Sequence, residues 1–239
     1  MNIKIVTFFL SLFDYINKKK VINFFKKNLN NKIENFIDVG AHHAETVKLF
    51  NKSFLIENFF CFEPNPSTFE VLKKKIKKIK NNSINIYNFA LGEINGYLNF
   101  NQSIESNSST LVDINNQSKY LIRKNNILNF FKSNDNVFNK IQVKVKTLKE
   151  FIEEKSINKI EILKIDTEGY DFNVIKGLEQ KIKNVQYIYF EHHFHDMLKK
   201  SYHLSDVHNY LKNNHFKKVF KIKMFFRKTF EYIYYNEKY

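Results

Sequence analysis

The sequence predicts an α/β fold with a mostly parallel seven-stranded sheet, helices on both faces and a C-terminal antiparallel hairpin. From Ile33 onward, short apolar runs typical of strands alternate with helical stretches, as in βα units stacked around a parallel sheet. The last two strand-like runs, Phe216–Ile222 and Thr229–Tyr235, are joined by a connection too short for a crossover helix, so we expect them to pair antiparallel. A chain of 239 residues with 43% hydrophobic residues can fill one such core.

The other elements follow from local patterns. The first strand ends in the turn around Gly40, and the second ends at Glu63, where Pro64 and Pro66 mark the start of a helix. The five strands expected in the parallel part of the sheet are, in order, Ile33–Val39, Leu55–Phe62, Ile84–Phe89, Ile160–Ile165 and Val185–Phe190. The expected helices are Glu45–Phe50, one through Leu72 to about Ile79, Leu148–Glu154, one through Val174 and Leu178, and Leu204–Lys212.

We expect residues 1–32 to be an N-terminal helical extension and residues 33–239 to form the main domain. The polar stretch of about 101–140 is interpreted as an insertion or lid, with one helical pattern near Tyr120–Phe131. An extended segment before it, Tyr97–Phe100, is expected to pair with a strand after it. That strand is indicated by alternating apolar residues, namely Ile141, Val143 and Val145.

The formal net charge of +15 allows a nucleic-acid or membrane partner, but the basic residues are mostly Lys spread along helices. We therefore favour a solvated lysine surface that attracts small anionic substrates such as sugar nucleotides. The single Cys61 excludes an internal disulfide and favours a cytoplasmic protein. The apolar N-terminal run is too short to span a membrane, so we expect no transmembrane segment. The N-terminal helix is a candidate surface for homo-oligomer formation.

The first chemical motif is the run FIDVGA at residues 36–41, a strand that ends in a glycine turn. Ligands of such sheets bind where the strands end, and Gly40 allows close backbone approach while Asp38 can attract an amino group. An ordinary βα turn is the alternative. The turn lacks the further glycines that a dinucleotide requires, and Glu45 would repel a pyrophosphate, so NAD and FAD are disfavoured.

The second motif is EPNP at residues 63–66. A carboxylate at the end of the second strand can accept hydrogen bonds from both ribose hydroxyls of a nucleoside. The alternative is an acidic residue favoured by the dipole of the following helix. We favour the ribose role for Glu63.

After the third strand, the chain is expected to turn at Ala90–Gly92. Together with NFALG at residues 88–92 and ILKIDTEGYD at residues 162–171, these motifs resemble the FkbM family of methyltransferases. The similarity covers about Phe36 to His193, and four motifs in the family order make it specific. The resemblance implies a Rossmann-like class I methyltransferase fold and S-adenosylmethionine as cofactor. It also implies O-methyl transfer to a hydroxyl of the sugar or polyketide type.

Transferred by position, the resemblance places Asp38, Gly40 and Ala41 at the methionine end of the cofactor and Glu63 at the ribose. The residues implied near the adenine are Asn88 and Ala90. The full expected cofactor set is Asp38, Gly40, Ala41, His42, Glu63, Asn88, Ala90 and Asp166. The chain departs from the family at His42, where Asn is usual, and at Ala44, where a second Gly is usual.

For catalysis, Asp166 and Glu168 at the end of the fourth strand can orient or deprotonate an acceptor hydroxyl. His192 and His193, in the run EHHFH, are candidates for the general base, and strand alternation predicts that one of the two faces the cleft. A divalent metal is a further option, with Asp166, Glu191 and His193 as candidate ligands beside Glu168. The structural alternative is that Asp166 holds a turn and Glu168 caps a helix.

We therefore predict an S-adenosylmethionine-dependent O-methyltransferase acting on a sugar hydroxyl, on a nucleotide-linked or surface-polysaccharide sugar. The nearest rival is a nucleic-acid methyltransferase. Base amino-group methylation commonly uses adjacent prolines, which Pro64 and Pro66 are not, and Cys61 lies inside an apolar strand where a nucleophile would be inert. The other rival is a non-catalytic scaffold with the same fold, against which the combination of Asp38, Glu63 and Asp166 argues.

Overall fold

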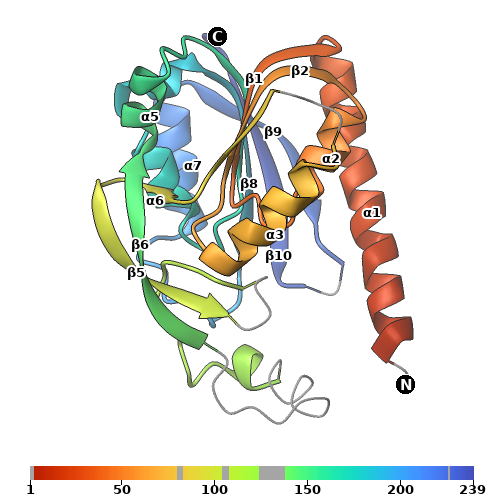
Figure 1. Cartoon of the computed structure of the whole chain (residues 1–239), viewed down its shortest axis with the longest axis vertical. Helices are drawn as coiled ribbons and strands as arrows, with labels where there is room; N and C mark the ends of the chain where they lie inside the picture. The colour runs from red at the N-terminus through yellow and green to blue at the C-terminus, as the bar shows by residue number, and fades with distance from the viewer. Residues whose placement is uncertain (1–2, 80–82, 104–107, 124–137, 226) are drawn as a thin grey trace.

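The chain is built around a seven-stranded sheet in the computed structural model, which describes residues 3–79, 83–103, 108–123, 138–225 and 227–239, with side chains from residue 14 onward (Figure 1). The strand order is β3-β2-β1-β7-β8-β10-β9. Its strands are β1 (Lys32–Val39), β2 (Leu55–Phe62), β3 (Ile84–Tyr87), β7 (Ile160–Ile165), β8 (Val185–His193), β9 (Phe216–Lys223) and β10 (Thr229–Asn236). The first five run parallel and β10 pairs antiparallel with both β8 and β9, which confirms the predicted sheet and hairpin.

Helices cover both faces of this sheet, as predicted (Figure 1). One face carries α5 (Leu148–Glu154), α6 (Asp171–Lys176), the 3-10 helix η1 (Glu179–Asn184) and α7 (Leu204–Asn213). The other face carries α1 (Ile3–Asn28), α2 (Glu45–Asn51) and α3 (Pro66–Ile76). The core is divided into two clusters, one on each face of the sheet, because side chains alternate along each strand. Ile37 of β1 packs in the first core cluster, under α5, α6, η1 and α7, and its neighbour Phe36 packs in the second core cluster, under α1, α2 and α3.

The turn between β2 and α3 is fixed by its own residues. Pro66 occupies the first turn of α3, where its missing N–H costs nothing. Asn65 is the N-cap, and its side-chain oxygen accepts a hydrogen bond from the Ser67 N–H at 3.1 Å. These contacts hold the backbone directly after Glu63 in one conformation.

A second, three-stranded sheet lies beside the main one, with the order β4-β6-β5. The segment Tyr97–Phe100 belongs to β5 (Gly96–Ser103) and pairs antiparallel with β6 (Phe138–Thr147), as predicted. The prediction of a simple turn at residues 90–92 was wrong, because they form the short strand β4 (Ala90–Gly92), parallel to β6. The expected helical pattern near Tyr120–Phe131 lies outside the described residues from 124 onward.

The helix α1 packs against the main sheet through its C-terminal half. Val21 and Phe25 are buried in the second core cluster. Closer to the N-terminus of α1, Asn17 donates a hydrogen bond to the Lys223 carbonyl at 3.1 Å, and Asp14 pairs with Arg227 at 3.0 Å. These contacts attach α1 to the β9–β10 hairpin. Within the part of the chain that the structure describes, no helix combines the length and apolar character needed to cross a membrane.

In the main sheet, two predicted strand ends differ from the structure by two residues or more. The third strand ends at Tyr87 and not at Phe89. The fifth strand, β8, continues to His193, so Glu191, His192 and His193 lie inside a strand and not in the turn after it. The reason is β10, whose Thr229 and Glu231 pair with His193 and Glu191 and extend β8 beyond its apolar part.

Candidate functional site

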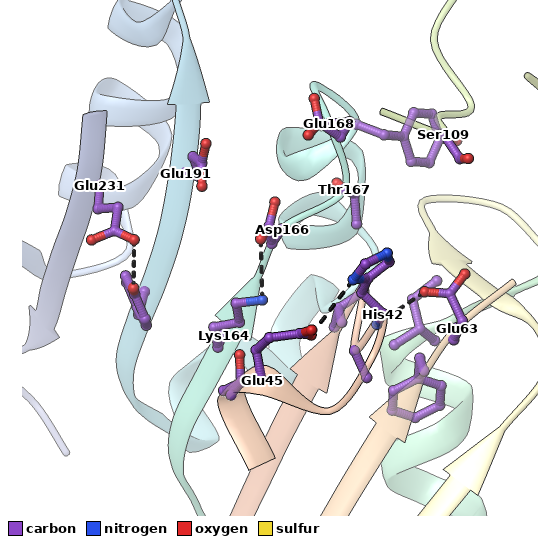
Figure 2. A pocket seen from close by; sticks show the side chains of 18 of the residues that line it. His42, Glu45, Glu63, Ser109, Lys164, Asp166, Thr167, Glu168, Glu191 and Glu231 are labelled. Atoms are coloured by element: carbon purple, nitrogen blue, oxygen red, sulfur yellow. Dashed lines mark hydrogen bonds and ion pairs between the residues drawn. The ribbon is translucent and has the colours of Figure 1, made fainter. Parts of the chain in front are cut away.

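A cavity of about 340 Å³ opens at the carboxyl ends of β1, β2 and β7. Gly40, Ala41 and His42 line it after β1, Glu63 lines it after β2, and Asp166 lines it after β7 (Figure 2). Parallel sheets bind their ligands at this edge, where chain order reverses between neighbouring strands. The volume is within the range of small-molecule sites.

The lining of this cavity is acidic although the chain as a whole is basic. Among the described residues it includes seven carboxylates, namely Asp14, Glu45, Glu63, Asp166, Glu168, Glu191 and Glu231. Three Lys or Arg side chains line it as well, namely Lys18, Lys164 and Arg227. A chain with a formal charge of +15 thus places more carboxylates than Lys and Arg side chains around this cavity, although burial raises the pKa values of Glu63, Glu191 and Glu231. Such a site favours a ligand that carries a positive charge.

Glu63 is held by backbone donors on both carboxylate oxygens. Oε2 accepts a hydrogen bond from the His42 N–H at 3.0 Å, and Oε1 accepts one from the Asn65 N–H at 2.9 Å. Burial raises the pKa of Glu63 to about 7, although both hydrogen bonds act in the opposite direction. Each oxygen retains acceptor capacity toward the cavity, as a ligand with a pair of hydroxyl groups requires.

Asp38 occupies a different position from the one expected for a cofactor ligand. It is fully buried and does not belong to the described residues that line the cavity. Its Oδ1 lies 3.2 Å from the Lys164 Nζ, and Lys164 also contacts Asp166 Oδ2 at 3.3 Å. Burial raises the pKa of Asp38 to about 6, against the attraction of Lys164. Asp38 therefore acts on the cavity through Lys164, whose ammonium holds Asp166 at the wall.

Lys164 is a site residue that the sequence analysis did not select. It lies in β7 directly opposite Asp38 of β1 and is 8% exposed. Burial alone would lower the pKa of Lys164, but attraction to Asp38 and Asp166 outweighs it and raises the pKa. One signal was available, because a lysine inside the apolar run ILKI must find a buried acid.

The glycine at position 40 allows two strand ends to meet. Its φ is 82°, and a Cβ built there would lie 2.0 Å from the backbone oxygen of Asp166. The Asp166 N–H in turn donates to the Val39 carbonyl at 2.9 Å. Gly40 therefore fixes how closely the β7 end, with Asp166, approaches the turn after β1.

The two departures from the family pattern both fall on left-handed backbone. His42 has a φ of 44° and Ala44 a φ of 65°, a region that Asn and Gly occupy at lower cost. The loop thus keeps its left-handed conformation without the usual residues. His42 compensates through its side chain, because its Nδ1 lies 3.5 Å from Glu45 Oε2 (Figure 2).

The two residues expected near the adenine separate in the structure. Ala90 is buried and lines the cavity. Asn88 is exposed and lies outside the set of described lining residues; its Nδ2 donates to the Glu63 carbonyl at 2.9 Å and to the Pro64 carbonyl at 3.2 Å. Asn88 therefore supports the Glu63 turn from outside.

Asp166 and Glu168 both face the cavity from the turn after β7 (Figure 2). Burial alone would raise the pKa of Asp166, but attraction to Lys164 outweighs it and lowers the pKa. Glu168 has a φ of 51°, and its carbonyl accepts a hydrogen bond from Thr110 Oγ1 at 2.8 Å. Glu168 does not cap the following helix, since the N-cap of α6 is Tyr170, without a side-chain cap hydrogen bond among the described residues. Asp171 fixes the preceding turn, where its Oδ1 accepts a hydrogen bond from the Thr167 N–H at 3.0 Å. This leaves the Asp166 and Glu168 carboxylates directed to the cavity.

The two histidines lie on opposite faces of β8, as alternation requires. His192 lies 3.3 Å from Lys200 Nζ, and burial lowers its pKa to about 3. His193 Nε2 lies 3.5 Å from Glu168 Oε2 and 3.7 Å from Glu191 Oε1. Within the described chain neither imidazole lines the cavity itself, but His193 lies directly behind two carboxylates that do.

Comparison with known proteins identifies the family. The model of the methyltransferase FkbM domain matches residues 38–218. The chain belongs to the FkbM methyltransferase family. The predicted resemblance is thereby confirmed over three quarters of the sequence.

This FkbM-family chain has similar relatives in sequence and in structure. "Methyltransferase 1" of Beauveria bassiana is 23% identical over 149 residues, which cover 61% of this chain and 58% of that protein. The crystal structure of methyltransferase FkbM from Methylobacillus flagellatus matches with a TM-score of 0.57 and 13% identity, over 87% of this chain and 44% of the other. The chain thus spans about half the length of these two relatives.

A third similar structure is magnesium protoporphyrin IX methyltransferase from Synechocystis with bound S-adenosylmethionine, with a TM-score of 0.54 and 6% identity over 95% of this chain and 81% of the other. Identities this low establish shared fold only. The predicted Rossmann-like class I methyltransferase fold is confirmed.

In this FkbM-family chain the cavity also has a wall that no motif indicated. It consists of Asp14 and Lys18 from α1 and of Arg227 and Glu231 from the β9–β10 hairpin. Glu231 Oε1 accepts a hydrogen bond from the Tyr189 hydroxyl at 2.9 Å, while its Oε2 is buried without a partner among the described residues (Figure 2). Burial raises the pKa of Glu231. This wall could not be predicted from the sequence, because its residues are single polar residues in segments without a known motif.

Proposed function

We propose that the chain is an S-adenosylmethionine-dependent O-methyltransferase that acts on a sugar hydroxyl. The observation that carries the proposal is the acidic cavity at the strand ends, with Glu63 placed to accept hydrogen bonds from two neighbouring hydroxyls. The family supports the reaction class. The bound S-adenosylmethionine of the Synechocystis methyltransferase supports the cofactor.

The residues of the cavity fit this cofactor. Glu63 would hold the ribose, since both of its oxygens keep acceptor capacity. Phe62, Ala90 and Leu91 supply apolar wall for the base, and the turn at Gly40 and Ala41 supplies backbone for the amino-acid end. When bound, the cofactor supplies a methyl group activated on a positively charged sulfur, a charge that the surrounding carboxylates favour.

The protein's own chemical task is to orient one hydroxyl and remove its proton. Asp166 and Glu168 are the carboxylates that face the cavity at the end of β7, and His193 lies 3.5 Å behind Glu168. We assign the proton-accepting role to this group. His192 is left out, because it lies on the other face of β8 beside Lys200. The rest of the rate enhancement comes from positioning the two reactants, because an in-line displacement needs the methyl donor and the acceptor oxygen held collinear.

The acceptor class rests on polar groups of β8 and β10 that line the cavity. Tyr189 and Glu231 are buried and hydrogen-bonded to each other, and Glu191 is half-buried opposite Glu231. Such closely spaced groups suit a compact ligand with several hydroxyls. The basic exterior would attract a nucleotide-linked sugar through its phosphates. The direct test incubates the full chain with labelled S-adenosylmethionine and a panel of nucleotide sugars, with transfer RNA as comparison. Label on RNA and not on sugars would revive the nucleic-acid alternative.

We expect Glu63→Gln to weaken S-adenosylmethionine binding by about 10- to 100-fold, since hydrogen bonds to a charged acceptor contribute about 1.5–3 kcal/mol. Isothermal titration calorimetry on the full chain measures this. The matched control is Glu57→Gln in β2, the strand that Glu63 follows; the Glu57 carboxylate pairs with Lys32 at the surface. Equal affinity of the Glu63→Gln variant and the native chain would refute the ribose assignment.

The affinity should also depend on pH. The pKa of Glu63 is raised to about 7, so the carboxylate is ionised above pH 7 and protonated below it. Protonation of Glu63 contributes stability to the unliganded fold that is fully present below the unfolded pKa and is lost as the pH rises through 7. Cofactor binding by the ionised form should therefore weaken about tenfold from pH 8 to pH 6. Titrations at these two pH values test it, and the Glu63→Gln variant should lose most of the difference.

A further inference from the structure

Four potential metal-binding side chains converge where β7 ends beside β8. Asp166 and Glu168 come from the turn after β7, and Glu191 and His193 are two apart on β8, so they share one face of the sheet. One ligand atom each of Asp166, Glu168 and His193 lie within 4.8 Å of one another. Glu191 Oε1 is 3.7 Å from the His193 imidazole. Figure 2 shows the three carboxylates around the same part of the cavity.

The imidazole of His193 is the unusual member of this group. Its side chain is 5% exposed, and its Nε2 has no hydrogen-bond partner among the described residues. Its other nitrogen, Nδ1, lies 3.2 Å from the Thr229 hydroxyl. A buried ring nitrogen that makes no hydrogen bond, with carboxylate oxygens only at 3.5 and 3.7 Å, is costly and requires an explanation. Metal-bound histidines have this arrangement, with one nitrogen fixed by an outer hydrogen bond and the other presented to the ion.

We propose that Asp166, Glu168 and His193 bind a divalent transition-metal ion, with Glu191 as a further donor. Carboxylate oxygens together with one imidazole suit Mn²⁺ and similar ions, and no thiol belongs to the set. Donor atoms around one such ion lie about 3 Å apart. The Glu168 side chain is 21% exposed, so a change of rotamer can close the remaining gap.

The position of the ion gives it a use. Asp166 and Glu168 line the cavity, so a bound ion would present open coordination positions to an acceptor's oxygen and orient it. This use rests on the proposed function. The binding of the ion does not, because it depends only on the four side chains.

The test titrates the full chain, stripped with EDTA and free of cofactor and acceptor, with MnCl₂ in a calorimeter. We expect one saturable site. His193→Gln should weaken the Kd about 100-fold, and Thr229→Val, which removes only the outer contact, about 10-fold. The matched control is His43→Gln. His43 belongs to a second cluster with His42 and Glu45, and its replacement should leave the Kd unchanged.

The outcomes separate this proposal from the proposed function. Absence of saturable binding with Mn²⁺, Mg²⁺ and Zn²⁺ would overturn the metal site, and so would a native Kd in a folded His193→Gln variant. If His193→Gln does not fold, Thr229→Val is the deciding variant, and an unchanged Kd for Mn²⁺ in it would overturn the site. The visible spectrum of the Co²⁺-loaded chain should also differ between Thr229→Val and the native chain, because the variant changes the position of the imidazole. Failure to bind S-adenosylmethionine, with Mn²⁺ binding intact, would count against the proposed function alone.

Discussion

Replacing Lys164 by Met should lower the free energy of unfolding by about 3–5 kcal/mol, because it leaves a buried carboxylate without its cation. Asp38 is fully buried, and Lys164 Nζ lies 3.2 Å from its Oδ1. Denaturant unfolding at pH 7 measures the loss. The deficit should shrink at pH 5, since Asp38 has a raised pKa of about 6 in the native chain and a higher one without Lys164, so it takes up a proton there.

Two further variants show whether the loss comes from the ion pair. The double variant Asp38→Asn with Lys164→Met should recover more than half of the stability, since no buried charge is left unpaired. Lys159→Met, an exposed lysine just before the same strand, should change stability by at most about 0.5 kcal/mol. If Lys164→Met and Lys159→Met proved equally mild, the buried pair would have no structural importance.

Gly40→Ala should destabilise the fold by about 2–5 kcal/mol and abolish measurable cofactor binding, because it combines backbone strain with a steric clash. The φ of Gly40 is 82°, and the added Cβ would lie 2.0 Å from the Asp166 backbone oxygen. The end of β7 must then shift and take Asp166 with it. Thermal unfolding and calorimetric titration with S-adenosylmethionine measure the two effects.

Gly96→Ala separates strain from clash. Gly96 also has a positive φ, 144°, but nothing lies within 4 Å of a Cβ built there. Gly96→Ala should therefore lower the free energy of unfolding only by the cost of the strained backbone, about 1–2 kcal/mol, and should bind cofactor as the native chain does. Similar losses of stability and binding in both variants would show that the contact between Gly40 and Asp166 has no special importance.

The sheet could be predicted from the sequence because its strands have strong apolar patterns. The bounds of β2 and β7 agree with the prediction, and that of β1 differs by one residue. The three residues of β4 are too few to show a period, so they resembled a turn. The extension of β8 to His193 depends on pairing with β10, a long-range contact that local pattern does not contain.

The site could be predicted only where a motif and a strand end coincide. Glu63 and Asp166 meet this condition, and both line the cavity. Asp38 was placed there by the same rule, but its partner Lys164 lies opposite it on the neighbouring strand β7, 126 residues later in the chain, and holds it inside. The α1 and hairpin wall has no local signature, because single polar residues become significant only when tertiary packing brings them together.

The position of β10 between β8 and β9 has a consequence for the nascent chain. During translation, the parallel half of the sheet can assemble while its growing edge, with Tyr187, Tyr189 and the backbone groups of β8, still awaits a neighbour. Because β10 lies between β8 and β9 but is synthesised after β9, β9 cannot join the sheet until β10 has paired with β8. Until Thr229–Asn236 has left the ribosome, the cavity lacks a wall and the edge remains open to pairing with other chains. Competence for ligand binding and protection from aggregation should therefore arise together, once β10 has taken its place.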